Sequence, residues 1–321
     1  MIFWRTHNMG GGIPPSEEYG WTPRAVDGTY VAPAAFLSMT DGGFKSARST
    51  GWTAARNVPL RVVAVDPHRP LGEDRASRLF GIARDAVEAV DRMCGPRPSR
   101  PASIDITLYL WDGTKRLGPG DDRISPANAN TGVTVRTPHT GACDILVYRR
   151  EEAVKTIAHE VLHAYGVGDW ANYDPGMLAA CGALARAVGL RVESEHALKP
   201  TEAIVDSLAI RLTAEAFGGR SWEDCVRHAE RLAARLAARA AAAGAWRQST
   251  GAFEYYFVKP LLMRRMDDLL AAHRAGLQRP DRAAVRRALR PAPPSRPSRR
   301  PGRSIVMRMT PRGLADLADL A

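Results

Sequence analysis

Cysteine is scarce in this chain of 321 residues, and its four copies lie far apart in the sequence. They are Cys94, Cys143, Cys181 and Cys225, a spacing that contains no CxxC pair and lacks the density of a disulfide-rich scaffold. The sequence therefore excludes a small domain held together by disulfides, and we expect these thiols to be reduced and mostly buried.

Long hydrophobic runs are also missing. No stretch reaches the roughly 20 apolar residues that a membrane-spanning helix needs, and the first residues lack the basic stretch and apolar core of a secretory signal. We expect no contact with a membrane and an intracellular location.

Lysine is rare as well, since only five of the 45 basic residues are lysines. The net charge is +11, but residues 279–321 hold eleven arginines and three aspartates, a net +8 that leaves residues 1–278 with +3. This end of the chain could contact nucleic acid or an acidic partner through charge alone, although it has no aromatic side chain for base stacking. More often such a stretch is a solvated linker.

Composition divides the chain into three parts. Residues 1–58 are rich in glycine, proline, serine and threonine, which predicts an irregular N-terminal arm. Residues 59–278 carry the apolar periodicity of a folded domain. Residues 279–321 contain an arginine-, proline- and serine-rich stretch that cannot bury enough apolar surface to offset the entropy of ordering, so we predict a basic, largely disordered tail.

Periodicity also predicts the elements of the central domain. Strands are expected at Leu60–Val65, Ile104–Trp111, Gly132–Arg136 and Asp144–Tyr148, and an amphipathic helix at Arg75–Met93. Helical patterns follow at Arg150–Tyr165, at Met177–Val188, from Thr201, at Ser221–Ala245 and at Phe253–His273. Strands that precede a mostly helical part indicate the α+β class.

The sequence TIAHEVLHAY at residues 156–165 is the motif that carries chemistry. Residues four apart lie one turn above each other on a helix, so His159 and His163 can present their imidazoles to one Zn2+ ion. Glu160 lies one position round the helix, where it can take a proton from a metal-bound water rather than bind the metal. We predict a zinc site with Glu160 as the general base of a hydrolase.

The surroundings of the motif favour this interpretation. Apart from the motif residues themselves, every position from Ile157 to Tyr165 is uncharged, as expected for a helix buried beneath a metal. The alternative is a surface helix with two incidental histidines and a solvated glutamate, which would carry charges at several of these positions.

A hydrolytic zinc site needs a third protein ligand. One candidate is Asp169, ten residues after His159, the spacing of the third ligand in metzincins, with Met177 as the Met turn. The other is Glu202, which lies one helical turn before Asp206. We favour Glu202, because Asp206 could then orient a ligand histidine through its other ring nitrogen, and both acids in an apolar helix are explained. Asp169 would then be a helix cap or a carboxylate that supports the loop.

The pattern HEVLH followed by TEAIVDSLA resembles the gluzincin branch of the zincin metallopeptidases. The resemblance implies zinc held by His159, His163 and Glu202, and water activated by Glu160. The gap from His163 to Glu202 is longer than in thermolysin-like enzymes, so Asp169 stays open as the third ligand.

The same resemblance implies a zincin-like fold, in which a small mixed sheet is followed by the active-site helix and a mostly helical C-terminal part. An edge strand of such a sheet aligns an extended peptide by main-chain hydrogen bonds, and Ile104–Trp111 or Asp144–Tyr148 could serve. The run ILVYRREEAVKTIAHEVLHAYGVGDW, with NANTGVTV before it and FEYYFVKPLLM after it, is also similar to uncharacterised HExxH proteins of large double-stranded DNA viruses. That similarity implies a viral protein in the virion or the infected host cell.

The oxyanion of the reaction needs a hydrogen-bond donor besides zinc. Tyr255 and Tyr256 are candidates, with Lys259 one turn further on, and we take Tyr256 as the catalytic choice. A tyrosine pair beside Phe253 and Phe257 is more often core packing with one hydroxyl that reaches a partner.

The sequence therefore predicts a zinc metallopeptidase, in particular an endopeptidase that acts on a protein or peptide substrate. The alternative is a catalytically inactive zincin-fold protein with a structural or virion-associated role, whose basic tail could contact nucleic acid. Metal content does not separate the two hypotheses, whereas hydrolysis of peptides does.

Overall fold

The computed structural model describes most of the chain between residues 48 and 270 and a short stretch near the C-terminus. The described residues are 48–55, 58–66, 73–95, 100–119, 121, 123–137, 139–190, 198–217, 221–243, 247–248, 251–267, 270, 289 and 305–310.

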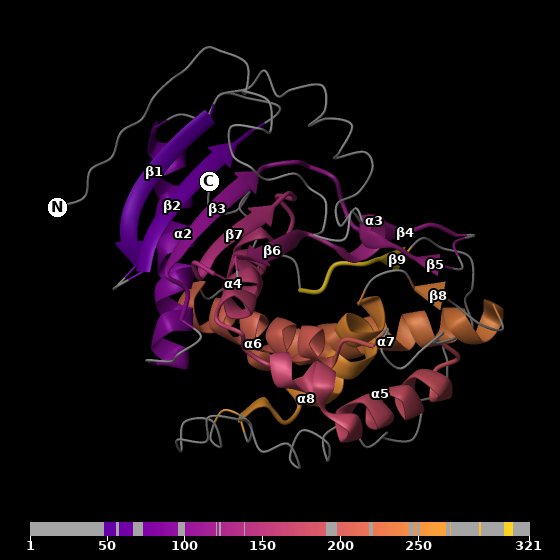
Figure 1. Ribbon diagram of the computed structural model, residues 1–321. Helices are drawn as coiled ribbons and strands as arrows, with labels where there is room; N and C mark the ends of the chain where they lie inside the picture. Colours follow the sequence, from indigo (N-terminus) through magenta and orange to yellow (C-terminus); the bar gives the residue numbers. More distant parts are fainter. Residues whose placement is uncertain are drawn as a thin grey trace.

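A five-stranded mixed sheet forms one side of the protein (Figure 1). Its strands follow in the order β1 (Arg48–Ala55), β2 (Val58–Val65), β3 (Ser103–Tyr109), β7 (Ala142–Val147) and β6 (Gly132–Arg136). The three inner strands are parallel, and β1 and β6 run antiparallel to them at the two edges. The sheet precedes a mostly helical part, so the protein belongs to the α+β class.

All four predicted strands are present, but two expectations about the sheet are wrong. Arg48–Ala55 falls in the predicted irregular arm 1–58, yet it pairs along its whole length with β2; residues 1–47 lie outside the described residues. Ile104–Trp111 and Asp144–Tyr148, proposed as edge strands, correspond to β3 and β7 inside the sheet. Among the described residues the edge strands are β1 and β6, and β6 lies beside β7 because a turn with Gly141 at φ 68° folds the chain back.

Helices cover one face of the sheet. α2 (Glu73–Cys94) leads from β2 to β3, and α4 (Ala153–Ala164) packs against α2, β6 and β7. Successive residues of a strand point to opposite faces, and the buried side chains follow that rule: Leu60, Val62 and Ala64 of β2 belong to the main core with these helices, whereas Val63 and Val65 belong to a second cluster with Leu146 and Tyr148. The four cysteines are free and buried, as expected.

A helical layer lies below α4 in Figure 1. α6 (Pro200–Phe217) packs against α4, and a π-helical turn η4 (Glu254–Val258) and α8 (Lys259–Met263) pack against α6. α5 (Pro175–Ala187) and α7 (Trp222–Ala243) complete the layer, and the short elements are η2 (Asp169–Tyr173), α3 (Pro126–Ala129), β4 (Arg116–Leu117), β5 (Arg123–Ile124) and β8 (Arg247–Gln248). Within the part of the chain that the structure describes, no helix is both long and apolar enough to cross a bilayer.

Residues 305–310, which we call the C-terminal segment, return to the body of the protein. Strand β9 (Ile305–Val306) pairs with β4, and the four residues that follow, Met307 to Thr310, are all buried. This part of the predicted tail 279–321 is therefore packed rather than disordered, because its methionines bury apolar surface that the arginine-rich stretch before it lacks. Leu289 is buried too, and the other residues of 279–321 lie outside the described ranges.

The stability of the sheet edge should depend on the missing side chain of Gly132. A Cβ there would lie 2.8 Å from the Leu146 carbonyl oxygen, 2.8 Å from Thr156 Cγ2 and 3.0 Å from Glu160 Oε1. We expect Gly132→Ala to lower the free energy of unfolding by about 1–3 kcal/mol. Gly81→Ala in α2, where a Cβ meets nothing within 4 Å, should instead raise it by up to about 1 kcal/mol. Urea denaturation measures both, and a Gly132→Ala protein as stable as the parent would contradict the close packing of β6.

Candidate metal centre

The helix α4 carries the HExxH motif through the interior of the protein. All of its side chains except that of His163 are buried between the sheet and the helical layer. Glu152, the residue before the helix, has φ 60° and ψ 20°, a left-handed conformation that side-chain-bearing residues seldom adopt. Its carboxylate is fixed by Lys115 on one oxygen and by the N–H and hydroxyl of Thr310, both at 2.5 Å, on the other. These contacts hold the residue from which α4 starts.

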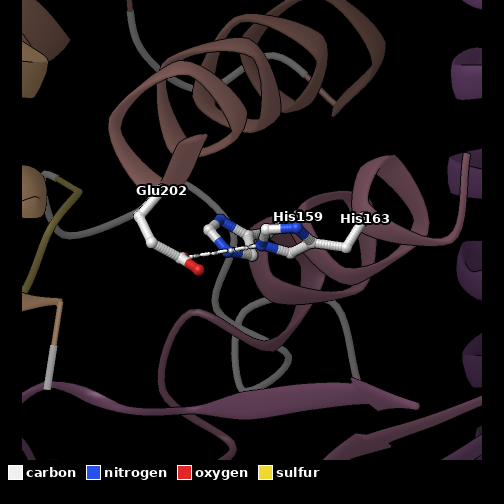
Figure 2. Close-up of side chains that lie close together, drawn as sticks. All are labelled: His159, His163 and Glu202. Carbon is white, nitrogen blue, oxygen red and sulfur yellow. Dashed lines mark hydrogen bonds and ion pairs between the residues drawn. The ribbon is translucent and has the colours of Figure 1, made fainter. Parts of the chain in front are cut away.

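Three side chains converge between α4 and α6 (Figure 2). His159 Nε2 and His163 Nε2 lie 3.1 Å apart. Glu202 Oε2 lies 3.3 Å from the first of these nitrogens and 3.5 Å from the second. The structure thus brings together the two motif histidines and the preferred third ligand of the sequence analysis.

This arrangement fits a metal ion. Ligand atoms about 2.0–2.1 Å from a tetrahedral zinc are about 3.3 Å from one another, and the three separations between His159, His163 and Glu202 bracket that value. Two imidazoles and one carboxylate are also a donor set that zinc accepts in hydrolytic sites. Among the described residues, these three make up the group of potential ligands whose atoms lie within 4.8 Å of one another.

Glu202 reaches the histidines because α6 begins next to the loop that follows α4. Thr201 Oγ1 donates to the carbonyl oxygen of Gly168 at 2.7 Å, and the Thr201 N–H donates to Asn172 Oδ1 at 3.2 Å. Gly168 has φ 81°, and a Cβ on it would lie 3.4 Å from Ile204 Cγ2. Glycine therefore permits both the left-handed turn and the close approach of the first turn of α6.

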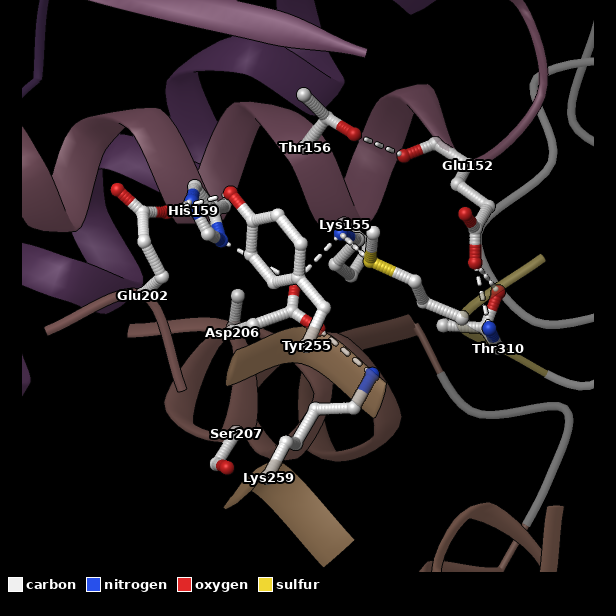
Figure 3. A network of polar contacts seen from close by, with 12 residues as sticks. Glu152, Lys155, Thr156, His159, Glu202, Asp206, Ser207, Tyr255, Lys259 and Thr310 are labelled. Atoms are coloured by element: carbon white, nitrogen blue, oxygen red, sulfur yellow. Dashed lines mark hydrogen bonds and ion pairs between the residues drawn. The ribbon is translucent and has the colours of Figure 1, made fainter. Parts of the chain in front are cut away.

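Asp206 lies one turn after Glu202 and is fully buried. Its Oδ1 lies 3.2 Å from His159 Nδ1 and accepts a 2.6 Å hydrogen bond from Lys155 Nζ, and its Oδ2 accepts one of 2.8 Å from Lys259 Nζ (Figure 3). Burial alone would raise the pKa of Asp206, but the two ammonium groups hold it well below its usual range. A carboxylate that accepts from His159 Nδ1 leaves Nε2 free to bind a metal, which is the orienting role predicted for Asp206.

His159 is a strong proton acceptor in this setting. Burial lowers the pKa of its imidazole, but the hydrogen bonds to Asp206 and Glu202 and the charge of Glu160 outweigh burial and raise the pKa to about 9. Glu202 is affected in the opposite sense, since burial would raise its pKa but the two histidines hold it well below its usual range. A metal cation can replace the proton that these acceptors attract.

Glu160 points to the edge of the sheet rather than to the three converging side chains. Its Oε2 accepts a 2.8 Å hydrogen bond from the hydroxyl of Thr134 in β6, and its Oε1 faces the space that a Cβ on Gly132 would fill. The carboxylate is buried and does not belong to the ligand group. Glu160 is therefore not one of the converging ligands, and its role as the base stays a prediction.

Asp169, the alternative third ligand, lies apart from this group. It heads the short helix η2 at the surface, and its carboxylate is absent from the ligand group of the described residues. It does not cap the next helix either, because the cap of α5 is Asp174, which accepts from the N–H of Met177. Met177 itself lies inside α5 rather than in a turn, so the metzincin arrangement is not formed.

The choice of Tyr256 as the catalytic tyrosine does not agree with the structure. The Tyr256 hydroxyl is buried and donates to the carbonyl oxygen of Met307 at 2.7 Å. The hydroxyl of Tyr255 instead donates to Glu202 Oε2 at 2.5 Å, and its ring lies 5.9 Å from that of His159. The π-helical turn η4 sets this orientation, because its wider winding changes the direction of each side chain relative to an α-helix.

Sequence reasoning missed Thr134 and the part that buried lysines play beside Asp206 and Glu152, although it noted Lys259 next to the tyrosine pair. Lys115, Lys155 and Lys259 are all buried, although lysine is one of the residues least often found fully buried. A signal was present: these are three of only five lysines in a chain that otherwise uses arginine. Thr134 carried no comparable signal.

Glu254, next to the candidate metal centre, should make stability depend on pH. Burial raises the pKa of Glu254 to about 7, although its Oε1 accepts a 2.7 Å hydrogen bond from the N–H of Lys199 and the side chain of Gln248 also interacts with the carboxylate. The folded pKa lies above the unfolded value of 4.5. Its contribution to stability is therefore fully present below about pH 4.5 and is lost as the pH rises through about 7.

We expect Glu254→Gln, which imitates the protonated acid, to remove this dependence. Relative to the variant, the parent should lose about 3 kcal/mol of unfolding free energy between pH 4.5 and pH 8, because the folded pKa lies about 2.5 above the unfolded one. Denaturant titrations of both proteins with a metal chelator present measure the difference. Parallel stability curves for parent and variant would show that Glu254 titrates normally.

The comparisons with known proteins give no relative from which the role of this site could be inferred. A scan against known protein families finds no match, and a comparison with curated proteins finds none either. The function must therefore be argued from the geometry of the site itself.

Proposed function

We propose that this protein is a zinc-dependent endopeptidase. The observation that carries the proposal is the convergence of His159, His163 and Glu202 at the separations of a tetrahedral zinc site. Two features of the fold support a zincin-like interpretation. The motif helix lies under the edge of a mixed sheet, and a helix of the following part supplies the carboxylate.

The reaction that this site supports is hydrolysis of an amide. Zinc, when bound, would polarise the carbonyl group and make a water more acidic. Glu160 would accept the proton of the water that attacks the carbonyl carbon and would deliver it to the amine as the C–N bond breaks. Thr134 holds the carboxylate of Glu160 in place through its 2.8 Å hydrogen bond.

The free edge of β6 suits an extended peptide substrate. No strand of the described residues pairs with its outer side. The N–H of Tyr148 in the chain after β7 donates to the carbonyl oxygen of Thr131 at 3.0 Å, so Thr131 faces inward. Because these groups alternate along an antiparallel strand, the outward backbone groups are those of Gly132, Thr134 and Arg136. A peptide paired there would pass beside Glu160.

Tyr255 is the better candidate for the donor to the oxyanion. Its hydroxyl lies 2.5 Å from Glu202 Oε2, whereas the hydroxyl of Tyr256 donates to the carbonyl oxygen of Met307. Burial and the charge of Glu202 raise the pKa of Tyr255 well above its usual value. The hydroxyl therefore stays protonated and can donate a hydrogen bond.

A relationship to viral HExxH proteins, and a location in the virion or the infected cell, stay predictions.

Substitution of the base and of a ligand should have different effects. We expect Glu160→Gln to retain one zinc per chain and to lose at least about 100-fold in peptide hydrolysis, because the acceptor of the proton is gone. His163→Ala should lose both zinc and hydrolysis. Metal analysis and cleavage of a peptide library measure the two properties. Equal hydrolysis by Glu160→Gln and the parent would end the catalytic assignment, and zinc binding without any hydrolysis would favour the structural alternative.

The hydroxyl of Thr134 should matter for the rate but not for the metal. Thr134→Val keeps the shape of the side chain but leaves Glu160 without its donor, so we expect a decrease in kcat of about tenfold with zinc affinity unchanged. Thr134→Ser keeps the hydroxyl and should restore most of the rate. Steady-state kinetics on the same peptide compare the three proteins. A Thr134→Val enzyme with the kcat of the parent would show that Glu160 does not need this contact.

A further inference from the structure

The C-terminal segment is wedged between the two layers of the protein. On the sheet side, the N–H of Met307 donates to the carbonyl oxygen of Lys115 at 2.9 Å. On the helical side, the Tyr256 hydroxyl donates to the carbonyl oxygen of Met307 at 2.7 Å, and His228 Nε2 lies 2.9 Å from the carbonyl oxygen of Arg308. Both layers thus bind the backbone of the segment, and these contacts do not depend on which side chains the segment carries.

The side chains at the end of this segment reach the charged groups beneath the metal centre (Figure 3). Thr310 donates to Glu152 Oε1 through both its N–H and its hydroxyl, each at 2.5 Å. Met309 Sδ lies 3.7 Å from Lys155 Nζ. Lys155 in turn donates to Asp206, the partner of His159. Three successive contacts therefore connect Met309 with a candidate metal ligand.

The buried ion pairs of Glu152 and Lys155 depend on the C-terminal segment for their shielding from water. Glu152 and Lys155 each have a buried counterion, Lys115 for the first and Asp206 for the second. Met309 is 3% exposed and Thr310 is fully buried, so the segment covers this cluster. An ion pair weakens several-fold when water raises the effective dielectric constant around it. Without the cover, Lys155 could turn to solvent and Asp206 would lose one of the groups that hold it against His159.

We propose that the C-terminal segment is a positioning element of the metal centre. By seating Met309 on Lys155 and Thr310 on Glu152, it holds Asp206, and through it His159, in the orientation that binds metal. The affinity for zinc then depends on the docking of a segment about 150 residues further along the chain. The inference rests on the proposed function in one respect, namely that His159 binds zinc.

A segment that only adds packing has a different consequence. Loss of its side-chain contacts would lower the stability of the fold, but the folded fraction would bind zinc as tightly as before. A positioning role instead weakens zinc binding in protein that is folded. The orientation of His159 also determines the ligand field of a bound metal, so the absorption spectrum of the Co2+ form provides a second readout.

The test compares two matched double variants of the full chain. Met309→Ala with Thr310→Val removes the side chain packed on Lys155 and the hydroxyl contact to Glu152, while the backbone N–H contact to Glu152 remains. Met309→Leu with Thr310→Ser retains the bulk and the hydroxyl. Competition with a chelator measures the zinc Kd, and circular dichroism verifies the fold. We expect the Ala/Val protein to have a Kd about tenfold higher and an altered Co2+ spectrum, and the Leu/Ser protein to stay within about twofold of the parent.

The outcomes separate this inference from the proposed function. An unchanged Kd and Co2+ spectrum in a folded Ala/Val protein would overturn the positioning role and leave the metal centre intact. A parent protein that binds neither ion would overturn the metal centre itself. If the Ala/Val protein is unfolded, the single Thr310→Val variant decides, with an expected increase in Kd of about threefold that Thr310→Ser reverses.

Discussion

The buried carboxylate of Asp206 is the constraint on which the rest of the centre depends. A carboxylate with no access to water costs several kcal/mol unless charged or hydrogen-bonding partners surround it. Here the partners are Lys155, His159 and Lys259, which come from two helices other than its own. Each helix is therefore held at the distance of a hydrogen bond from the same two oxygens. That requirement explains why α4, α6 and α8 pack around one point rather than only along their apolar faces.

Lysine suits this role better than arginine. Its ammonium group is compact and has three donors, so it fits between two carboxylates where a planar guanidinium would need more room. The chain uses arginine almost everywhere else, but Lys115, Lys155 and Lys259 are buried in one connected cluster of charges. Glu152, the acid at the start of α4, belongs to that cluster and binds the C-terminal segment. The start of the motif helix and the end of the described chain are thus held by the same electrostatic interactions.

Both layers of the fold contribute residues to the candidate site. The sheet side supplies Thr134, which holds Glu160, and leaves the backbone of β6 open at the edge. The helical side supplies Glu202 and Tyr255, whose hydroxyl donates a hydrogen bond to Glu202 next to the histidines. In the proposed reaction, a substrate between the layers would meet Glu160 on one side and the hydroxyl of Tyr255 on the other. Gly132 permits the carboxylate of Glu160 to lie against β6, since any side chain at residue 132 would collide with that carboxylate.

Local sequence was sufficient wherever one helix determines the geometry. Four-residue spacing places His159 with His163, and Glu202 with Asp206, on one face because the rise and turn of a helix are constant. Alternation and apolar runs likewise predicted β2, β3, β6 and β7. Tertiary packing decided what no spacing encodes: that Glu202 and not Asp169 meets the histidines, that Tyr255 and not Tyr256 faces them, and that residues 309 and 310 contact the start of α4. These choices depend on distances between elements far apart in the chain, and such distances result from the packing of buried surfaces and charges rather than from the periodicity of any one segment.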